Sequence, residues 1–137
     1  MISPASLPRA ILLVDTRTVP LRRLSETLQR AGHHVIPAAS FDEAKRALAV
    51  YEPAVLISAL RLAAFNGIHL VHLGRLANPR MPAIILSSER DATLHEEVHR
   101  VGATLLIEPV QTPMLLSLLT DSRGEDSLGH FPSRERA

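Results

Sequence analysis

The sequence predicts an α/β fold in which helices cover both faces of a parallel sheet. Apolar runs occur at residues 10–14, 54–57, 83–86 and 105–107, and each is continuous where a half-exposed strand would alternate. Continuous runs of this length are typical of parallel strands that are buried on both faces. Segments with helical periodicity separate the runs, so strand and helix alternate along the chain. With 137 residues, of which 46% are hydrophobic, the chain is long enough for one such domain and its core.

The first predicted helix begins at Thr18, has Pro20 in its first turn and stops at Gly32, a residue type common at helix ends. Its inward stripe is expected to be Leu21, Leu24, Leu28 and Ala31. A weaker strand follows at residues 34–36 and is ended by Pro37. Because proline cannot donate to a strand ladder, we expect this strand at an edge of the sheet.

The remaining helices follow the same alternation. A capping box formed by Ser40 and Glu43 predicts the start of the second helix. Further helices are expected at residues 67–76, 91–101 and 112–120. The inward side chains are predicted to be Ala44, Ala47, Leu48 and Tyr51 in the second helix, and Leu94, Val98 and Val101 in the fourth.

The two ends of the chain differ from this pattern. From residue 121 onward the sequence is polar and lacks periodicity, which favours disorder. We therefore expect an N-terminal extension at residues 1–8, one domain at residues 9–120 and a disordered tail at residues 121–137.

Composition excludes several classes of function. Fifteen basic residues against fourteen acidic ones give a net charge of +1, which favours neither nucleic acid nor an anionic membrane as a partner. The chain has no cysteine, so disulfides, thiolate metal sites and a cysteine nucleophile are impossible. The apolar run near the N-terminus spans five residues, too few for a signal peptide or a membrane span. A soluble, cytoplasmic protein is expected.

Several short motifs occur at the spacing of one known family. They are ILLVD at residues 11–15, NGI at residues 66–68, PAIILS at residues 82–87, and GA at residues 102–103 followed by Glu108-Pro109. Over residues 9–120 the chain resembles the receiver domains of response regulators. The resemblance implies a flavodoxin-like sheet of strand order 2-1-3-4-5. It also implies phosphoryl transfer from a phosphohistidine to an aspartate, with a divalent cation held by an acid pair.

The same resemblance shows which parts of that chemistry are missing. Ala59 occupies the phosphoacceptor position, and a methyl group cannot attack phosphorus. The acid pair reads Asp15-Thr16, so one carboxylate is replaced by a hydroxyl. The hydroxyl after the fourth strand is present as Ser87, whereas the lysine position holds Glu108. We expect no enzymatic activity, no cofactor and no metal at this degenerate pocket.

Two carboxylates then stand where the family has an acid and a lysine. Asp15 and Glu108 are expected to repel each other, which raises the pKa of a nearby carboxyl group. Three outcomes are open: the pair recruits a cation, one carboxyl is partly protonated, or Arg17 or Arg61 neutralises it. Either these acids are remnants on solvated loops, or they form a pocket that binds a cation or a small ligand.

A second motif, His95-Glu96-Glu97-Val98-His99, formally matches the H-E-x-x-H helix of zinc hydrolases. If Leu94, Val98 and Val101 face the core, the two histidines lie about 90–130° around the helix from it, along its flank or in solvent. The sequence provides no third ligand nearby, so a solvated helix face is the favoured interpretation.

The fifth helix carries more apolar residues than one core contact requires. By the resemblance, Leu115 and Leu119 face the sheet, which leaves Met114 and Leu118 outward, and Leu105 stands at the position of the family's aromatic switch residue. We therefore expect a protein partner or a homodimer to use the fourth helix, the fifth strand and the fifth helix. The leading hypothesis is a phosphorylation-independent signalling module in a two-component-type pathway. The alternative is a small-ligand or cation sensor that uses the altered acidic pocket.

Overall fold

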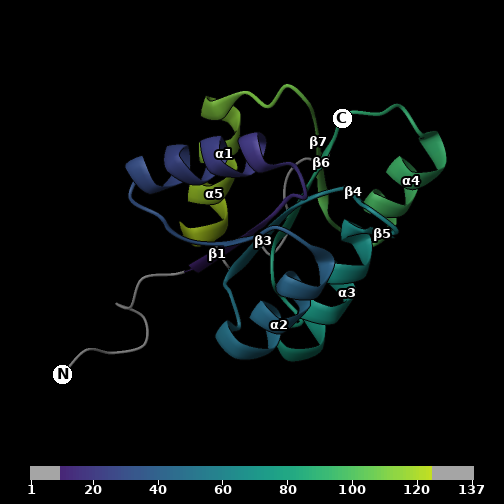
Figure 1. Ribbon diagram of the computed structural model, residues 1–137, viewed down its shortest axis with the longest axis horizontal. Coiled ribbons are helices and arrows are strands. Elements are labelled where there is room, and N and C mark those ends of the chain that lie inside the picture. The colour runs from purple at the N-terminus through teal and green to yellow at the C-terminus, as the bar shows by residue number, and fades with distance from the viewer. Residues whose placement is uncertain (1–9, 125–137) are drawn as a thin grey trace.

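A computed structural model describes residues 10–124 of the chain (Figure 1). In chain order the elements are β1 Ala10–Val14, α1 Thr18–Arg30, β2 His34–Ala38, α2 Phe41–Tyr51, β3 Val55–Ala59, β4 Arg61–Leu62, β5 Phe65–Asn66, α3 Gly67–Ala77, β6 Ala83–Ser87, α4 Ala92–Arg100, β7 Thr104–Ile107 and α5 Thr112–Gly124. The predicted alternation of strands and helices is confirmed. In this part of the chain, no helix is both long and apolar enough to cross a membrane.

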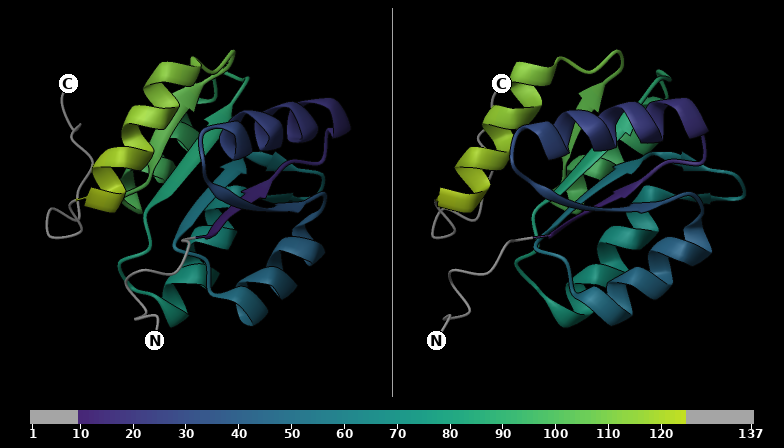
Figure 2. Two further views of the ribbon diagram at one scale, coloured as in Figure 1. Left: turned by 90° about the vertical axis from the view of Figure 1, so that its left-hand side faces the viewer. Right: turned by 60° about the vertical axis from the view of Figure 1, so that its left-hand side comes forward.

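Five parallel strands form the central sheet in the order β2-β1-β3-β6-β7. Counted without the short β4–β5 hairpin, this is the predicted order 2-1-3-4-5. α1 and α5 lie on one face of the sheet, and α2, α3 and α4 lie on the other (Figure 2). Such a sheet has two edges, and here they are β2 and β7.

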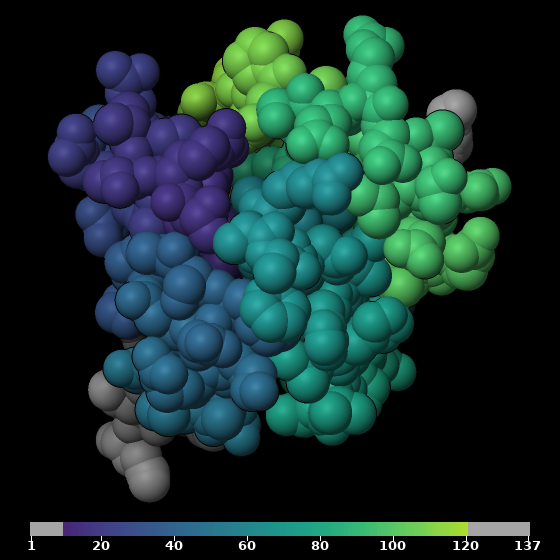
Figure 3. Space-filling view, turned by 45° about the vertical axis from the view of Figure 1, so that its right-hand side comes forward, coloured from purple at the N-terminus to yellow at the C-terminus, as the bar shows by residue number. Residues whose placement is uncertain are grey.

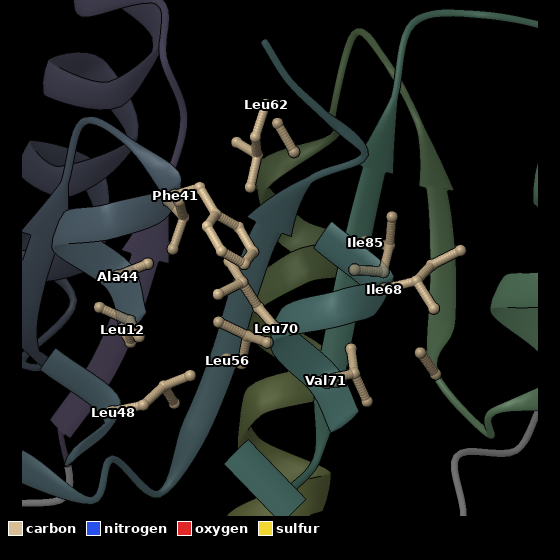
Figure 4. Packing of buried hydrophobic residues seen from close by; sticks show 14 of the residues in the cluster. Leu12, Phe41, Ala44, Leu48, Leu56, Leu62, Ile68, Leu70, Val71 and Ile85 are labelled. Atoms are coloured by element: carbon tan, nitrogen blue, oxygen red, sulfur yellow. The ribbon is translucent and has the colours of Figure 1, made fainter. Parts of the chain in front are cut away.

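The core consists of two apolar layers, because successive side chains of a strand point to opposite faces. In β1, Leu12 belongs to the layer under α2 and α3, whereas its neighbour Leu13 belongs to the layer under α1 and α5. Figure 4 shows the first layer, where Leu48 from α2 and Leu70 from α3 approach Leu56 of β3. The continuous apolar runs are therefore explained by burial on both faces.

The capping box of α2 is confirmed. The Oγ atom of Ser40 accepts a hydrogen bond from the Glu43 backbone N–H at 3.1 Å. The Glu43 carboxylate reaches back and accepts from the Ala39 N–H at 2.8 Å, one residue before the N-cap. These bonds satisfy backbone donors that have no partner inside the helix.

Several predicted details are wrong. Tyr51 is exposed, because it is the last residue of α2 and extends past the sheet, and Ala31 is exposed because it is the C-cap of α1. Pro37 lies inside β2 and does not end it; the edge position of the strand makes this possible. α5 ends at Gly124, four residues later than predicted, and the rest of the predicted tail lies outside the described residues. The predicted N-terminal extension at residues 1–8 also lies outside the described residues.

The antiparallel pair β4–β5 was not predicted. Arg61 pairs with Asn66 and Leu62 with Phe65, which makes a short hairpin between β3 and α3. Leu62 is buried, and the ring of Phe65 stacks on Phe41 with 4.3 Å between centroids. Strands of two residues are too short to produce an alternating pattern, so sequence periodicity could not reveal them.

Candidate functional site

The carboxyl ends of β1, β3, β6 and β7 meet at one edge of the sheet, and the predicted pocket residues lie there. Asp15 follows β1, Ala59 ends β3, Ser87 ends β6 and Glu108 follows β7. Backbone bonds tie these ends together: the Glu108 N–H donates to the Ser87 carbonyl at 2.8 Å. The structure therefore brings together residues that lie up to 93 positions apart in sequence.

Arg17 joins the two carboxylates of this pocket. Its Nε atom donates to Asp15 Oδ1 at 3.1 Å, and its Nη2 atom donates to Asp15 Oδ2 at 2.8 Å and to Glu108 Oε2 at 2.7 Å. The Asp15 side chain is 6% exposed and that of Glu108 is 19% exposed, whereas Arg17 remains 47% exposed. We call this arrangement the Arg17 clamp.

The Arg17 clamp offsets the repulsion between Asp15 and Glu108 that the sequence predicted. Hydrogen bonds from Arg17 to Asp15 first and to Glu108 second raise the pKa of Arg17 above its usual value. Of the three open outcomes, neutralisation by Arg17 is therefore the one observed. Arg61, the other candidate, instead pairs with Glu89 at 3.0 Å and Asp91 at 3.6 Å.

The local chain geometry explains why Arg17 folds back onto Asp15. The backbone N–H of Arg17 donates to Asp15 Oδ1 at 2.9 Å, which closes a tight turn directly after β1. Arg17 is also the N-cap of α1, in an extended conformation. Thr16, between the two, is exposed. This turn places the guanidinium group above the pocket.

Ala59 is buried at the end of β3, so a methyl group occupies the position of the family's phosphoacceptor. The adjacent Ser58 is also buried, and its Oγ atom donates to the Ala59 carbonyl oxygen at 2.8 Å. Ser58 Oγ lies where α3 begins, so close to Gly67 that a Cβ atom at that glycine would come within 2.7 Å of it. The Ser58 side chain therefore lies against the start of α3.

His95 contacts Ser87, one of the pocket residues, although it was expected along the flank of its helix or in solvent. Its Nε2 atom lies 3.2 Å from Ser87 Oγ. Ser87 donates its hydroxyl proton to the Glu89 carbonyl at 3.0 Å and accepts from the Glu89 N–H at 3.1 Å. The tautomer of the His95 ring sets which of the two groups donates in this contact.

The loop between β6 and α4 is held by further contacts. Asp91 is the N-cap of α4 and accepts from the Leu94 N–H at 3.1 Å. Arg61 contacts both Glu89 and Asp91 from the β4–β5 hairpin. His99, in contrast to His95, is exposed. Within residues 10–124, no group of three or more His, Asp or Glu side chains is arranged to hold a metal ion.

The predicted interface residues have different environments. Met114 is 55% exposed, and Ile107 at the end of β7, which was not predicted, is 48% exposed. Leu105 and Leu118 are only partly buried and pack against opposite layers of the core. Leu118, which was expected to lie outward, is thus partly accessible and partly packed against the layer under α1 and α5.

The Glu108-Pro109 peptide bond is cis. The strand order of the sheet agrees with a domain of the receiver class. No family model matches the chain. The response regulator protein FleR of Pseudomonas aeruginosa is 27% identical over 126 residues, which are 91% of this chain and 26% of that protein. The chain thus spans about a quarter of the length of this curated relative.

Solved structures agree with this class. A response regulator receiver domain protein (CheY-like) from Methanospirillum hungatei has a TM-score of 0.82 at 20% identity, over 89% of this chain and 98% of that one. Chemotaxis protein CheY4 of Vibrio cholerae has a TM-score of 0.75 at 28% identity, over 83% of this chain and 98% of that one. The chain has the receiver-domain fold of two-component response regulators, and the comparisons support the response regulator receiver family.

Proposed function

We propose that this chain is a phosphorylation-independent receiver-like module that signals through protein–protein contact. The observation that carries the proposal is the Arg17 clamp beside Ala59. The phosphoacceptor position holds a methyl group, and the two neighbouring carboxylates are already neutralised by a side chain of the same protein.

The clamp also argues against phosphoryl chemistry by another residue of the pocket. A carboxylate that accepts two or more charge-assisted hydrogen bonds is a poor nucleophile, because attack would require it to leave its guanidinium partner. Asp15 accepts two such bonds from Arg17, and Glu108 accepts one. The Ser87 hydroxyl is engaged with both backbone groups of Glu89.

The alternative function, a cation sensor in the acidic pocket, receives less support from this geometry. A guanidinium group between the two carboxylates repels a divalent ion and occupies the oxygens that would coordinate it. For a cation to bind, Arg17 would first have to leave.

The face that fits a partner is formed by α4, β7 and α5, and we call it the α4–β7–α5 face. β7 is an edge strand, and all four of its residues are at least partly accessible, whereas every residue of β6 is buried. Ile107 and Met114 are exposed apolar side chains on this face. An accessible edge strand beside apolar side chains is a typical contact surface for a second chain.

Treatment with acetyl phosphate or beryllofluoride plus magnesium tests the phosphorylation claim. We expect the intact mass and the backbone amide spectrum to stay unchanged, while a receiver domain with its aspartate intact responds under the same conditions. A gain of one phosphoryl group, or a shift of the pocket amides with beryllofluoride, would contradict the proposal.

Light scattering tests the contact surface. We expect a homodimer, or a complex with a signalling partner, that is lost in a variant with both Ile107→Glu and Met114→Glu. Val50→Glu is the matched control, because Val50 is an exposed apolar residue on α2, away from the α4–β7–α5 face. Monomeric wild type together with unchanged partner binding by the double variant would refute this part of the proposal.

A further inference from the structure

A groove of about 720 Å³ runs between α3 and α4, and α4 with its C-cap contributes Glu97, Arg100 and Val101 to its lining. Figure 3 shows the two helices next to each other, α3 in teal and α4 in green. The groove is open to solvent, and its polar lining comes from both helices. Its floor includes Ile68 and Val101.

α3 contributes a regular row of hydrogen-bond donors to the groove. Asn66, His69, His72 and Arg75 all line it, at a constant spacing of three residues. The row covers about 13 Å along the helix, at 1.5 Å per residue. An extended peptide covers that distance with about four residues. Because each step of three residues turns about 60° short of a full circle, the row winds around α3, and an extended segment meets its members in succession along this winding line.

Neighbouring contacts orient two members of this row. The Asn66 side-chain oxygen accepts from the His69 N–H at 3.2 Å, so its amide group is left to donate. The His69 ring packs against Phe41 with 5.3 Å between centroids. His72 is exposed.

Arg75 brings a half-buried positive charge to the end of the row. Its guanidinium group donates to the carbonyl oxygens of Met81, Val101 and Gly102, at the C-terminal end of α4 and its surroundings. Three of its five N–H groups are used in these bonds. Among the described side chains of residues 10–120, no carboxylate lies within 4.0 Å of it, so backbone carbonyl dipoles balance its charge there.

α4 adds a second guanidinium group from the opposite wall. Arg100 approaches Glu96 only at 4.0 Å, with both side chains largely exposed, and such a pair contributes little. Glu97 is the one carboxylate among the residues that line the groove. The lining therefore has a net positive charge and an excess of donors over acceptors, which complements an anionic ligand.

From this charge and spacing we propose that the α3–α4 groove binds an acidic extended segment of a partner protein. Carboxylates of the segment accept hydrogen bonds from the donor row of α3 and face Arg100 from α4. The site is separate from the Arg17 clamp. It shares the helix α4 with the α4–β7–α5 face, but neither Ile107 nor Met114 lines it. It does not rest on the proposed function.

The probe for this site is an acetylated, amidated tetraglutamate peptide, and tetraglutamine of the same length is its control. Each is titrated into the full-length chain at low salt while the backbone amide spectrum is recorded. We expect tetraglutamate to shift amides of α3 and α4, and tetraglutamine to shift none. Equal shifts with both peptides, or shifts confined to other elements, would overturn the proposal.

Charge reversal provides the matched comparison. Arg100→Glu is expected to weaken tetraglutamate binding at least tenfold. Arg22→Glu reverses an exposed charge on α1, on the opposite face of the sheet, and is expected to leave the affinity within twofold. Both variants change the net charge equally, so an equal loss in the two would show general attraction and refute a specific groove. Met114→Glu should have no effect, which separates this site from the α4–β7–α5 face.

Discussion

Replacing Arg17 with alanine should destabilise the fold more than any other removal of a surface arginine. The change removes one hydrogen bond to Glu108 and two to Asp15, and leaves Asp15 only its bond from the backbone N–H of residue 17. Removing one partner of a fully buried ion pair costs about 3–5 kcal/mol. Because the Arg17 side chain is 47% exposed, water replaces part of the interaction. We therefore expect a loss of about 2 kcal/mol, between the values for exposed and for fully buried pairs.

Thermal unfolding followed by circular dichroism measures this loss. For a domain of this size, about 2 kcal/mol corresponds to a decrease in Tm of about 7 °C. The control is Arg61→Ala, which also removes an arginine with two acidic partners, but whose side chain is 55% exposed and whose partners are exposed as well. That control should lose less than about 1 kcal/mol. If the two variants lose the same stability, the clamp is an ordinary surface pair and the reasoning fails.

The dependence on pH gives a further check. Hydrogen bonds to Asp15 and Glu108 raise the pKa of Arg17 in the folded state, so its stabilising effect is fully present below the pKa that arginine has in the unfolded chain. Titration of Arg17 itself therefore cannot change the difference between wild type and variant from about pH 6 to 9. In addition, Arg17→Ala combined with Glu108→Gln should be more stable than Arg17→Ala alone, because the double variant no longer carries two carboxylates without a cation.

Three further outcomes are expected. Magnesium chloride, at ten times its Kd for the Arg17→Ala variant, should stabilise that variant by about 1.4 kcal/mol in a thermal-shift assay and leave wild type unchanged. An equal effect on both proteins would contradict the role of the Arg17 clamp. Ser40→Ala should cost about 1 kcal/mol in urea unfolding, since it removes the N-cap bond to the Glu43 N–H, and no loss would mean that water replaces the cap. Gly67→Ala should destabilise by about 1–3 kcal/mol, because the added Cβ would lie 2.6 Å from the carbonyl oxygen of Ala59; a neutral result would show that α3 can shift.

The fold could be predicted from the sequence because its signals are local and repeated. Each central strand is a continuous apolar run and most helices carry an apolar stripe, and both patterns follow from burial. The errors fall where elements end or are very short. Tyr51 is the last residue of its helix, and the β4–β5 hairpin has two residues in each strand.

The sequence predicted which residues lie at the site, but it did not predict which side chains they contact. Ala59, Ser87 and Glu108 could be assigned to the carboxyl edge because parallel strands end there together. The contact of His95 with Ser87 could not be predicted, because it depends on how α4 is rotated about its axis. The H-E-x-x-H match was the available signal for His95, although it pointed to zinc chemistry.

The sequence by itself determined the order of elements, the residues of the core and the absence of an acid at position 59. These features depend on near neighbours in the chain and on the periodicity that burial imposes. Only the tertiary structure decided which cation neutralises Asp15 and Glu108, and that the donor row of α3 faces Arg100 of α4. The physical reason is distance along the chain: Arg17 and Glu108 are 91 residues apart, and a charge at that separation finds its partner only through packing.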